Sequence, residues 1–345
     1  SKVADAANRI LKNGDDIMWA SKWKVFRLCA GILACINLSV VDLLAQDYPV
    51  KPIRLVVGFT TGGVSDVLAR LVAQQLTESL GQQMIVENRA GASGMIANER
   101  VAKSPPDGYT LLIIGGSSAI LPALRAKMSY DLERDLAPVS LLAISPFVLV
   151  VHPSVPARNV KELIAIARSR QHELRYATVG MGSPPHIMTE LLKSMAKVNI
   201  LAVPYKGGGD AVVALASGQI DMYISSVPSL LPLRDAGRIR LLAVTSAKRL
   251  STLPSLPTLD ESGLPGYDYA NWTGVVAPAG LPKDIVARLN AELGKAINTA
   301  EMKETLTKKL GMEPQTNTPE QFAAFMRGML EKNAKVIKSI GMKAE

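Results

Sequence analysis

The sequence has little cysteine, few aromatic residues and no clustered positive charge. Its 345 residues include two cysteines, Cys29 and Cys35, so the part from Gln46 onward has none. That absence excludes a disulfide framework, a thiol nucleophile and a cysteine metal site from this part of the chain. Aromatic residues make up 5% of the sequence and the basic residues are scattered. Nucleic acid is therefore not an expected partner.

Sequence motifs of common enzyme classes are also missing. There is no G-x-S-x-G elbow, no G-x-x-x-x-G-K-[ST] loop, no G-x-G-x-x-G and no H-E-x-x-H. The three histidines are not at metal-ligand spacing, and we expect His152 to be structural and His172 to be exposed. His186 follows a glycine turn, where contact with a ligand and a capping or packing role are both open. No metal, cofactor or catalytic residue is expected.

The N-terminal segment predicts export. Basic residues at 22, 24 and 27 precede a mostly apolar run over 28–41 that is too short to span a membrane comfortably. We interpret residues 1–45 as an upstream segment, with Met18 a plausible natural start, followed by a signal peptide that ends at Ala45. This interpretation predicts a periplasmic protein.

Two alternatives to a cleaved signal peptide remain open. A lipobox over 32–35 would make Cys35 a lipidated N-terminus, although the residue two before such a cysteine is usually small. An uncleaved membrane anchor is disfavoured by Asp42. After residues 1–45 are removed, 33 basic and 26 acidic side chains remain, a formal charge of +7 that suits small anionic ligands.

The stretch from Pro52 to Ala73 combines an apolar strand, a glycine turn and an amphipathic helix. The apolar run 53–57 is typical of a strand buried on both faces of a parallel sheet. Gly62 and Gly63 supply a turn, and apolar residues then recur at helical spacing. Such a turn directs backbone N–H groups and the positive end of a helix dipole at one point, which suits a carboxylate or phosphate. An ordinary connection that binds nothing is the alternative.

Two further glycine turns lead into expected helices, at 180–183 and 207–209. Strands alternate with helices through most of the chain, which predicts parallel sheets. These turns lie far from Gly62 in sequence, so we expect them in a different lobe. An acidic ligand would then bind in a cleft between the lobes.

Several segments together resemble a known family. They are Tyr48-Pro-Val-Lys-Pro-Ile-Arg-Leu-Val-Val, Gly62-Gly63 with Asp66 and Ala69-Arg70, Val86-Glu-Asn-Arg-Ala-Gly91, Pro106-Asp-Gly-Tyr-Thr-Leu111, Val203-Pro-Tyr-Lys-Gly207, Ala243-Val-Thr-Ser246 and Ala277-Pro-Ala-Gly280. Through these segments the chain resembles, over nearly all of 48–340, the exported solute-binding proteins of tripartite tricarboxylate transporters, the Bug or TctC family.

The resemblance implies a type II periplasmic-binding-protein fold, with two α/β lobes of mainly parallel sheets flanked by helices and two crossovers. Lobe 1 would then be formed by 46–145 plus 246–345 and lobe 2 by 146–245. It also implies that glycine loops of both lobes grip a ligand carboxylate, often with ordered water. Carried over residue by residue, the expected ligand-binding residues are Phe59, Thr60, Thr61, Gly63, Ser65, Asp66, Ser117, Thr178, Gly182, Ser183, His186, Tyr205 and Gly207.

The chain departs from the family pattern at two places near the expected pocket. Thr60-Thr61 replaces the usual Ala-Pro, and Leu121-Pro122 replaces a frequent Asn-Pro, so the ligand's identity stays open. An amino-acid ligand would need a carboxylate for its ammonium group. Asp66 and Asp210 are candidates for that role, and capping is the alternative for both.

The resemblance favours a monomeric binding protein that delivers a small carboxylate to membrane transporter subunits. A second hypothesis is an exported sensor that presents its closed form to a receptor. A third is an α/β enzyme acting on a small carboxylate, for which His186, Lys206 and Asp66 are the available groups.

Overall fold

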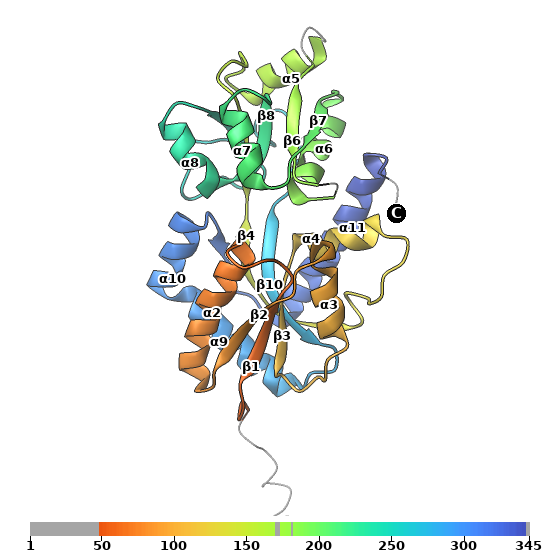
Figure 1. Cartoon of the computed structure of the whole chain (residues 1–345), viewed down its shortest axis with the longest axis vertical. Helices are drawn as coiled ribbons and strands as arrows, with labels where there is room; N and C mark the ends of the chain where they lie inside the picture. Colours follow the sequence, from red (N-terminus) through yellow and green to blue (C-terminus); the bar gives the residue numbers. More distant parts are fainter. Residues whose placement is uncertain (1–47, 170–172, 181, 343–345) are drawn as a thin grey trace, which may run out of the picture. The chain divides into compact units, whose positions relative to one another are not determined.

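The computed structural model describes residues 48–169, 173–180 and 182–342 (Figure 1). The targeting segment expected at 1–45, with Cys29 and Cys35, lies outside the described residues, as does His172. The chain from Lys51 onward forms one compact unit that contains two β-sheets. We call the elements of the six-stranded sheet and its helices the first lobe, and those of the five-stranded sheet the second lobe.

The first lobe has the strand order β11-β4-β10-β3-β1-β2. Its strands are β1 (Ile53–Val57), β2 (Met84–Asn88), β3 (Thr110–Gly115), β4 (Leu136–Ser145), β10 (Asn271–Pro278) and β11 (Glu313–Pro314). Its helices are α2 (Val64–Leu80), α3 (Met95–Ala102), α4 (Gly116–Leu124), α9 (Lys283–Asn298), α10 (Ala300–Glu304) and α11 (Pro319–Ser339), with short turns η2 (Ala92–Gly94) and η3 (Thr305–Lys309).

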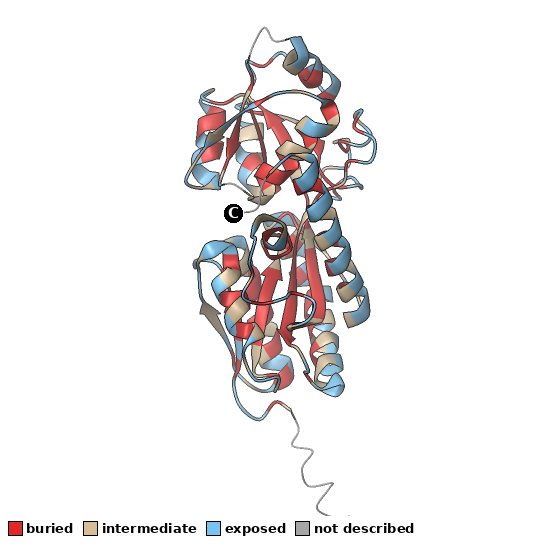
Figure 2. Ribbon diagram, turned by 90° about the vertical axis from the view of Figure 1, so that its right-hand side faces the viewer, coloured by how far each residue is buried: buried red, intermediate tan, exposed pale blue. Residues whose placement is uncertain are grey.

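The second lobe has the strand order β7-β6-β8-β5-β9. Its strands are β5 (Phe147–Val151), β6 (Arg175–Thr178), β7 (Leu201–Pro204), β8 (Met222–Ser226) and β9 (Arg240–Val244). Its helices are α5 (Val160–Ser169), α6 (Pro184–Ala196), α7 (Gly208–Ala216) and α8 (Val227–Asp235). Buried residues gather on the strands and on the helix faces that cover them (Figure 2).

The two-lobed arrangement expected from the sequence is confirmed, but both sheets are mixed rather than mainly parallel. In the first lobe β1 pairs in parallel with β2 and β3, whereas β10 runs antiparallel to β3 and β4. In the second lobe β5 runs antiparallel to β8 and β9. The physical reason is that β5 and β10 follow crossings between the lobes. A strand that arrives from the other lobe enters its sheet at the end where the parallel strands finish, so it runs in the opposite direction to them.

The chain crosses between the lobes twice. The first crossing is short, since β4 ends at Ser145 and β5 begins at Phe147. The second runs from Thr245 to β10. The crossings are hydrogen bonded to each other, because Phe147 N–H donates to Thr245 Oγ1 at 3.0 Å and Thr245 N–H donates to Phe147 O at 2.9 Å.

Helix α11 contacts both lobes. It packs against α4 and β4 of the first lobe and against α6 of the second. Its apolar face places Phe322 and Phe325 edge-on to the buried Trp272, with ring centroids 5.8 and 5.6 Å away. It is also tied to the second crossing, since Lys332 Nζ lies 3.0 Å from an Asp268 carboxylate oxygen. The sequence analysis assigned residues 246–345 to lobe 1, so the contact of α11 with α6 of the second lobe is a finding of the structure.

Candidate functional site

The loop between β1 and α2 leaves the start of a helix uncapped. Gly62 adopts φ +85°, which favours glycine, and Gly63 is the N-cap with no side-chain hydrogen bond to the first turn. Phe59, Thr60 and Thr61 are exposed beside it. The first turn of α2, which includes the half-buried Ser65, therefore presents backbone N–H groups that no N-cap side chain occupies, although the carboxylate of Asp66 lies in the same turn.

Asp66 is the internal support of this loop. Its buried carboxylate accepts hydrogen bonds from Gly62 N–H at 2.9 Å, from Arg70 Nε and Nη2 at 3.0 Å each, and from Asn88 Nδ2 at 2.9 Å. Asn88 Nδ2 also donates to Phe59 O at 3.0 Å. The hydrogen bonds from Arg70 are the main reason that the pKa of Asp66 falls from 3.8 to about 2. A carboxylate held in this way shapes the loop and has no acceptor site left for a ligand ammonium group.

The Asp66 network makes a prediction about pH dependence. Because its pKa is lower in the folded protein, Asp66 stabilises the fold above about pH 4, and this contribution disappears as the pH falls toward 2. We expect Asp66→Asn to lose on the order of 2 kcal/mol of unfolding free energy at pH 7, since its charge-assisted hydrogen bonds weaken. Urea unfolding at pH 7 and pH 3 measures this difference, which should shrink at pH 3. Asp284→Asn, an exposed aspartate in the first turn of α9, is the control. A difference that is the same at both pH values would contradict the assignment.

The loop after β3 lies at the same sheet edge, because β1 and β3 are parallel neighbours. Helix α4 begins there without a side-chain cap, and Ser117 is half-buried in its first turn. The neighbouring hydroxyl of Ser118 is already engaged, since it accepts from Asn98 Nδ2 at 2.8 Å. Ser117 is thus the hydroxyl of this turn that remains available.

Two polar groups at the start of β10 were missed by sequence reasoning. Asn271 Oδ1 and Trp272 Nε1 are buried and have no hydrogen-bond partner among the described residues. Both lie next to Gly116, where an added Cβ would stand 2.4 Å from Asn271 Oδ1. Antiparallel pairing of Thr273 with Gly115 brings them to this edge. Only the register of β10 against β3 reveals this proximity, so the linear sequence carried no signal for it.

In the second lobe, the loop after β6 uses most of its own donors internally. Gly182 N–H donates to His186 Nδ1 at 3.1 Å, and Ser183 N–H donates to Gly180 O at 3.2 Å. Thr178 Oγ1 also donates to Gly180 O, at 3.1 Å. Burial lowers the pKa of His186, which keeps its ring neutral and its Nδ1 able to accept. His186 and Thr178 thus shape the loop around Gly182.

The helix that follows this loop has fewer free backbone N–H groups for an anion than the glycine turn at 180–183 led us to expect. Helix α6 starts with Pro184 and Pro185, which have no N–H groups. The group that remains is Ser183 Oγ, which is buried and has no partner among the described residues. A hydroxyl therefore takes the place here that backbone N–H groups hold at the start of α2.

The loop after β7 adjoins the loop after β6. Parallel pairing sets Thr178 beside Pro204, and Tyr205 N–H donates to Thr178 O at 2.8 Å. Gly207 is the N-cap of α7 and provides no side-chain cap. The sequence placed Gly208 and Gly209 in the turn, but both belong to the first turn of α7, which lengthens the uncapped start of this helix.

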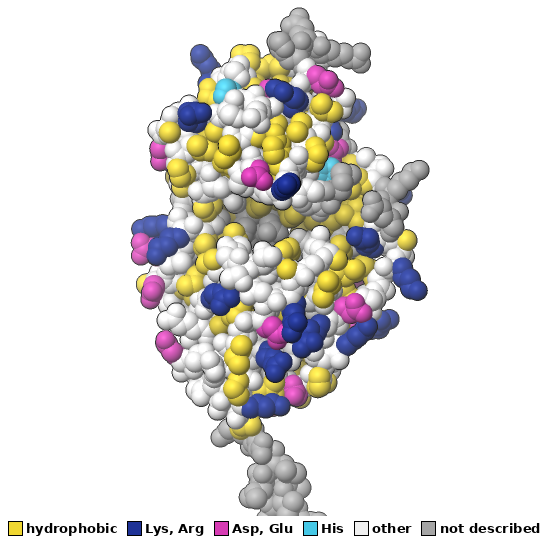
Figure 3. All heavy atoms as spheres, in the orientation of Figure 1, with side chains coloured by type: hydrophobic (Ala, Val, Ile, Leu, Met, Phe, Trp, Pro, Cys, Tyr) yellow, Lys and Arg dark blue, Asp and Glu magenta, His cyan; other side chains and the backbone are white. Residues whose placement is uncertain are grey.

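The two lobes meet at Gly182, which adopts φ +74°. An added Cβ there would stand 2.2 Å from Leu124 Cδ1 and 4.0 Å from Ile120 Cγ2, both on α4 of the first lobe. The loop of the second lobe thus rests on the first lobe beside its uncapped helices. The surface is hollowed between the lobes (Figure 3). The expected site residues form two groups, one on the sheet edge of each lobe, and Gly182 links the groups.

Comparison with known proteins assigns the chain to a family. The sequence model described as "Tripartite tricarboxylate transporter family receptor" (TctC) matches residues 68–342. The chain belongs to the TctC family. Among curated proteins it is 35% identical over 321 residues to Protein BugT of Bordetella pertussis, a match that covers 92% of this chain and 96% of that protein.

Solved structures of TctC-type proteins share this fold and hold carboxylates. The structure of R. palustris Rpa4515 with adipate is 40% identical, with a TM-score of 0.76 over 87% of this chain and 100% of that one. MatC from Rhodopseudomonas palustris with bound malate is 32% identical, with a TM-score of 0.71 over 84% of this chain and 100% of that one. These neighbours confirm the type II periplasmic-binding-protein fold.

Other features of the TctC chain bear on chemistry and location. Among the described residues, no group of three or more histidine, aspartate or glutamate side chains is arranged to hold a metal ion. In the same part of the chain, no helix has both the length and the apolar character needed to cross a membrane.

The departure from the family pattern at Leu121-Pro122 falls inside α4, one turn before the Leu124 that meets Gly182.

Proposed function

We propose that this protein is an exported solute-binding protein that captures a small dicarboxylate between its two lobes and delivers it to a tripartite tricarboxylate-type membrane transporter. The observation that carries the proposal is the set of uncapped helix starts on facing lobes. Helices α2 and α4 begin on the first lobe and α7 on the second, each without a side-chain cap. Two such groups suit a ligand with one carboxylate at each end.

Membership of the TctC family and the dicarboxylates bound by two similar proteins support this ligand class. The proposal places the protein in the periplasm, as a monomer whose closed, loaded form docks on membrane subunits. An exported sensor that docks on a receptor is the alternative use of the same site. Adjacent genes for a large and a small membrane subunit distinguish the transporter from the sensor.

Binding without catalysis also agrees with the state of the groups that an enzyme would use. Asp66 is saturated with hydrogen bonds, and His186 Nδ1 accepts from Gly182 N–H. Lys206 is exposed in the loop between β7 and α7. The groups that face a ligand are thus hydroxyls and backbone N–H groups, which hold an anion without reacting with it.

A thermal-shift titration of residues 46–345 tests the proposal. Adipate and malate are compared with dimethyl adipate, which has the same carbon chain as adipate and no charge. A dicarboxylate present at 100 times its Kd should stabilise the protein by about 2.7 kcal/mol, whereas the diester should have no effect. Recovery of the ligand unchanged supports binding, and its consumption would support an enzyme. Failure of every dicarboxylate to shift the transition would refute the ligand class.

A further inference from the structure

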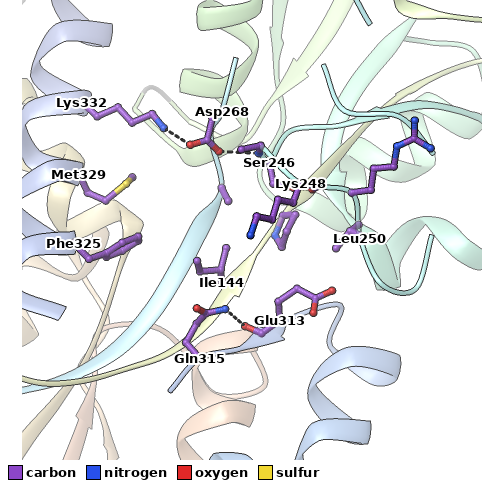
Figure 4. Close-up of a pocket in the computed structure, with 14 residues that line it drawn as sticks. Ile144, Ser246, Lys248, Leu250, Asp268, Glu313, Gln315, Phe325, Met329 and Lys332 are labelled. Atoms are coloured by element: carbon purple, nitrogen blue, oxygen red, sulfur yellow. Dashed lines mark hydrogen bonds and ion pairs between the residues drawn. The ribbon is translucent and has the colours of Figure 1, made fainter. Parts of the chain in front are cut away.

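A cavity of about 360 Å³ lies beside the crossings between the lobes (Figure 4). We call it the hinge cavity. Its walls come from the first crossing at Pro146, the second crossing at Ser246 and Ala270, and the first lobe at Glu313 of β11 and Phe325 of α11. It includes none of the residues of the interlobe site. Its size falls in the range of small-molecule sites, about 300–1,000 Å³.

The anionic groups around the hinge cavity are already satisfied. Asp268 pairs with Lys332 at 3.0 Å and accepts from Ala247 N–H at 2.9 Å. Glu313 accepts two hydrogen bonds from Ser251, at 3.2 Å from its N–H and at 2.7 Å from its Oγ. Asp268 is therefore already paired with a cation, whereas Glu313 is held by neutral donors of Ser251.

One cationic side chain that lines the cavity has no anionic partner among the described residues. Arg249 pairs with Glu261 at 2.9 Å, outside the cavity wall. Lys248 is exposed, and its ammonium group has no ion pair or hydrogen bond among the described residues. Its side chain extends into the middle of the cavity (Figure 4), toward Ile144. The apolar side chains of Phe325 and Met329 project from α11 on one side. A free positive charge above an apolar floor complements a small molecule with one anionic group and a hydrocarbon body.

We propose that the hinge cavity is a second ligand site, which takes an aliphatic monocarboxylate, with its carboxylate on Lys248 and its chain against Ile144, Phe325 and Met329. Both crossings contribute to its walls, so rotation of one lobe against the other changes its shape. A ligand that fits the cavity stabilises the arrangement in which the cavity exists. In that same arrangement Gly182 meets Leu124. Occupation of the hinge cavity therefore strengthens binding between the lobes.

Ligand-detected NMR titration with octanoate tests the site in residues 46–345. We expect saturable binding that Lys248→Gln weakens about tenfold, since an ion pair is lost. Ala270→Leu, which fills the cavity from the second crossing, should remove binding without touching a charge. Lys335→Gln is the matched control, because Lys335 is an exposed lysine of α11 outside the cavity wall. Absence of saturable binding, or equal binding by wild type, Lys248→Gln and Ala270→Leu, would overturn the site.

Calorimetry with adipate at increasing octanoate concentrations measures the coupling between the two sites. This experiment rests on the proposed function, whereas the octanoate titration is independent of it. We expect octanoate to lower the Kd of adipate about threefold, up to a plateau, and adipate to lower the Kd of octanoate by the same factor. Lys248→Gln should need about tenfold more octanoate to reach the plateau. A Kd for adipate that rises without limit would show that octanoate competes between the lobes, and would overturn the proposal. An unchanged Kd would overturn the coupling.

Discussion

Gly63→Val is expected to lower the affinity for a dicarboxylate at least about 100-fold while the protein still folds. Gly63 has φ −71° and ψ 163°, a conformation open to any residue. An added Cβ would meet only Thr60 O, at an ordinary 3.5 Å. The branched side chain therefore fits the fold but occupies the space in front of the uncapped first turn of α2. Loss of two charge-assisted hydrogen bonds is enough for an effect of this size.

Calorimetry with adipate measures the affinity of the Gly63→Val variant, and far-UV circular dichroism shows whether the variant is folded. Gly294→Ala is the control, because Gly294 lies within α9, has open space around it and is remote from the expected site residues in sequence. Its affinity for adipate should match that of the wild type. Gly62 is a poor choice for the test, since its φ of +85° would add backbone strain to any effect on the ligand. A folded Gly63→Val protein that keeps its affinity would move the carboxylate site away from α2.

Gly182→Val is expected to weaken binding about 30-fold through the contact between the lobes. The Cβ of a side chain at this position would stand 2.2 Å from Leu124 Cδ1, the end of a half-buried side chain, so Leu124 must turn aside or the loop of the second lobe must move away from α4. A dicarboxylate held from both lobes loses the contacts of one lobe when the lobes are kept apart. Adipate calorimetry on the variant measures the loss.

Two companion variants separate this clash from backbone strain. Gly180 also has positive φ, +118°, but open space around it, so Gly180→Val carries the strain without the clash and should lose less affinity. The double variant Gly182→Val with Leu124→Ala removes the obstructing side chain and should recover about tenfold. If Leu124→Ala gives no recovery, the loss arises within the loop and the contact with α4 is not responsible.

Much of the fold could be predicted from local patterns. The apolar run at 53–57, the glycine turn at 62–63 and the helical spacing beyond it correspond to β1, its loop and α2. The loops after β1 and β3 share an edge because neighbouring parallel strands end together, and the same holds for β6 and β7. Each of these inferences needs only the periodicity of a segment and the direction of its strand.

Other parts depend on tertiary pairing and were not predictable in the same way. Strand β4 was missed because Pro138 and Ser140 interrupt its apolar run, and its place is fixed by pairing with β10. Asn271 and Trp272 reach the candidate site only through the antiparallel register of β10. Which groups of a loop remain free is also a tertiary property. Gly182 N–H is taken by His186, whereas Ser183 Oγ is left without a partner.

The position of β10 has a consequence for the order in which the chain acquires structure. This strand lies between β3 and β4, so the sheet of the first lobe is incomplete until residues 271–278 have left the ribosome. All five strands of the second lobe are encoded before that point, in one continuous segment. The sheet of the first lobe therefore forms only late in synthesis, through pairing between strands that are far apart in sequence, and such pairing is slow. If the protein is exported as proposed, this delay gives the chain time to cross the membrane before it folds.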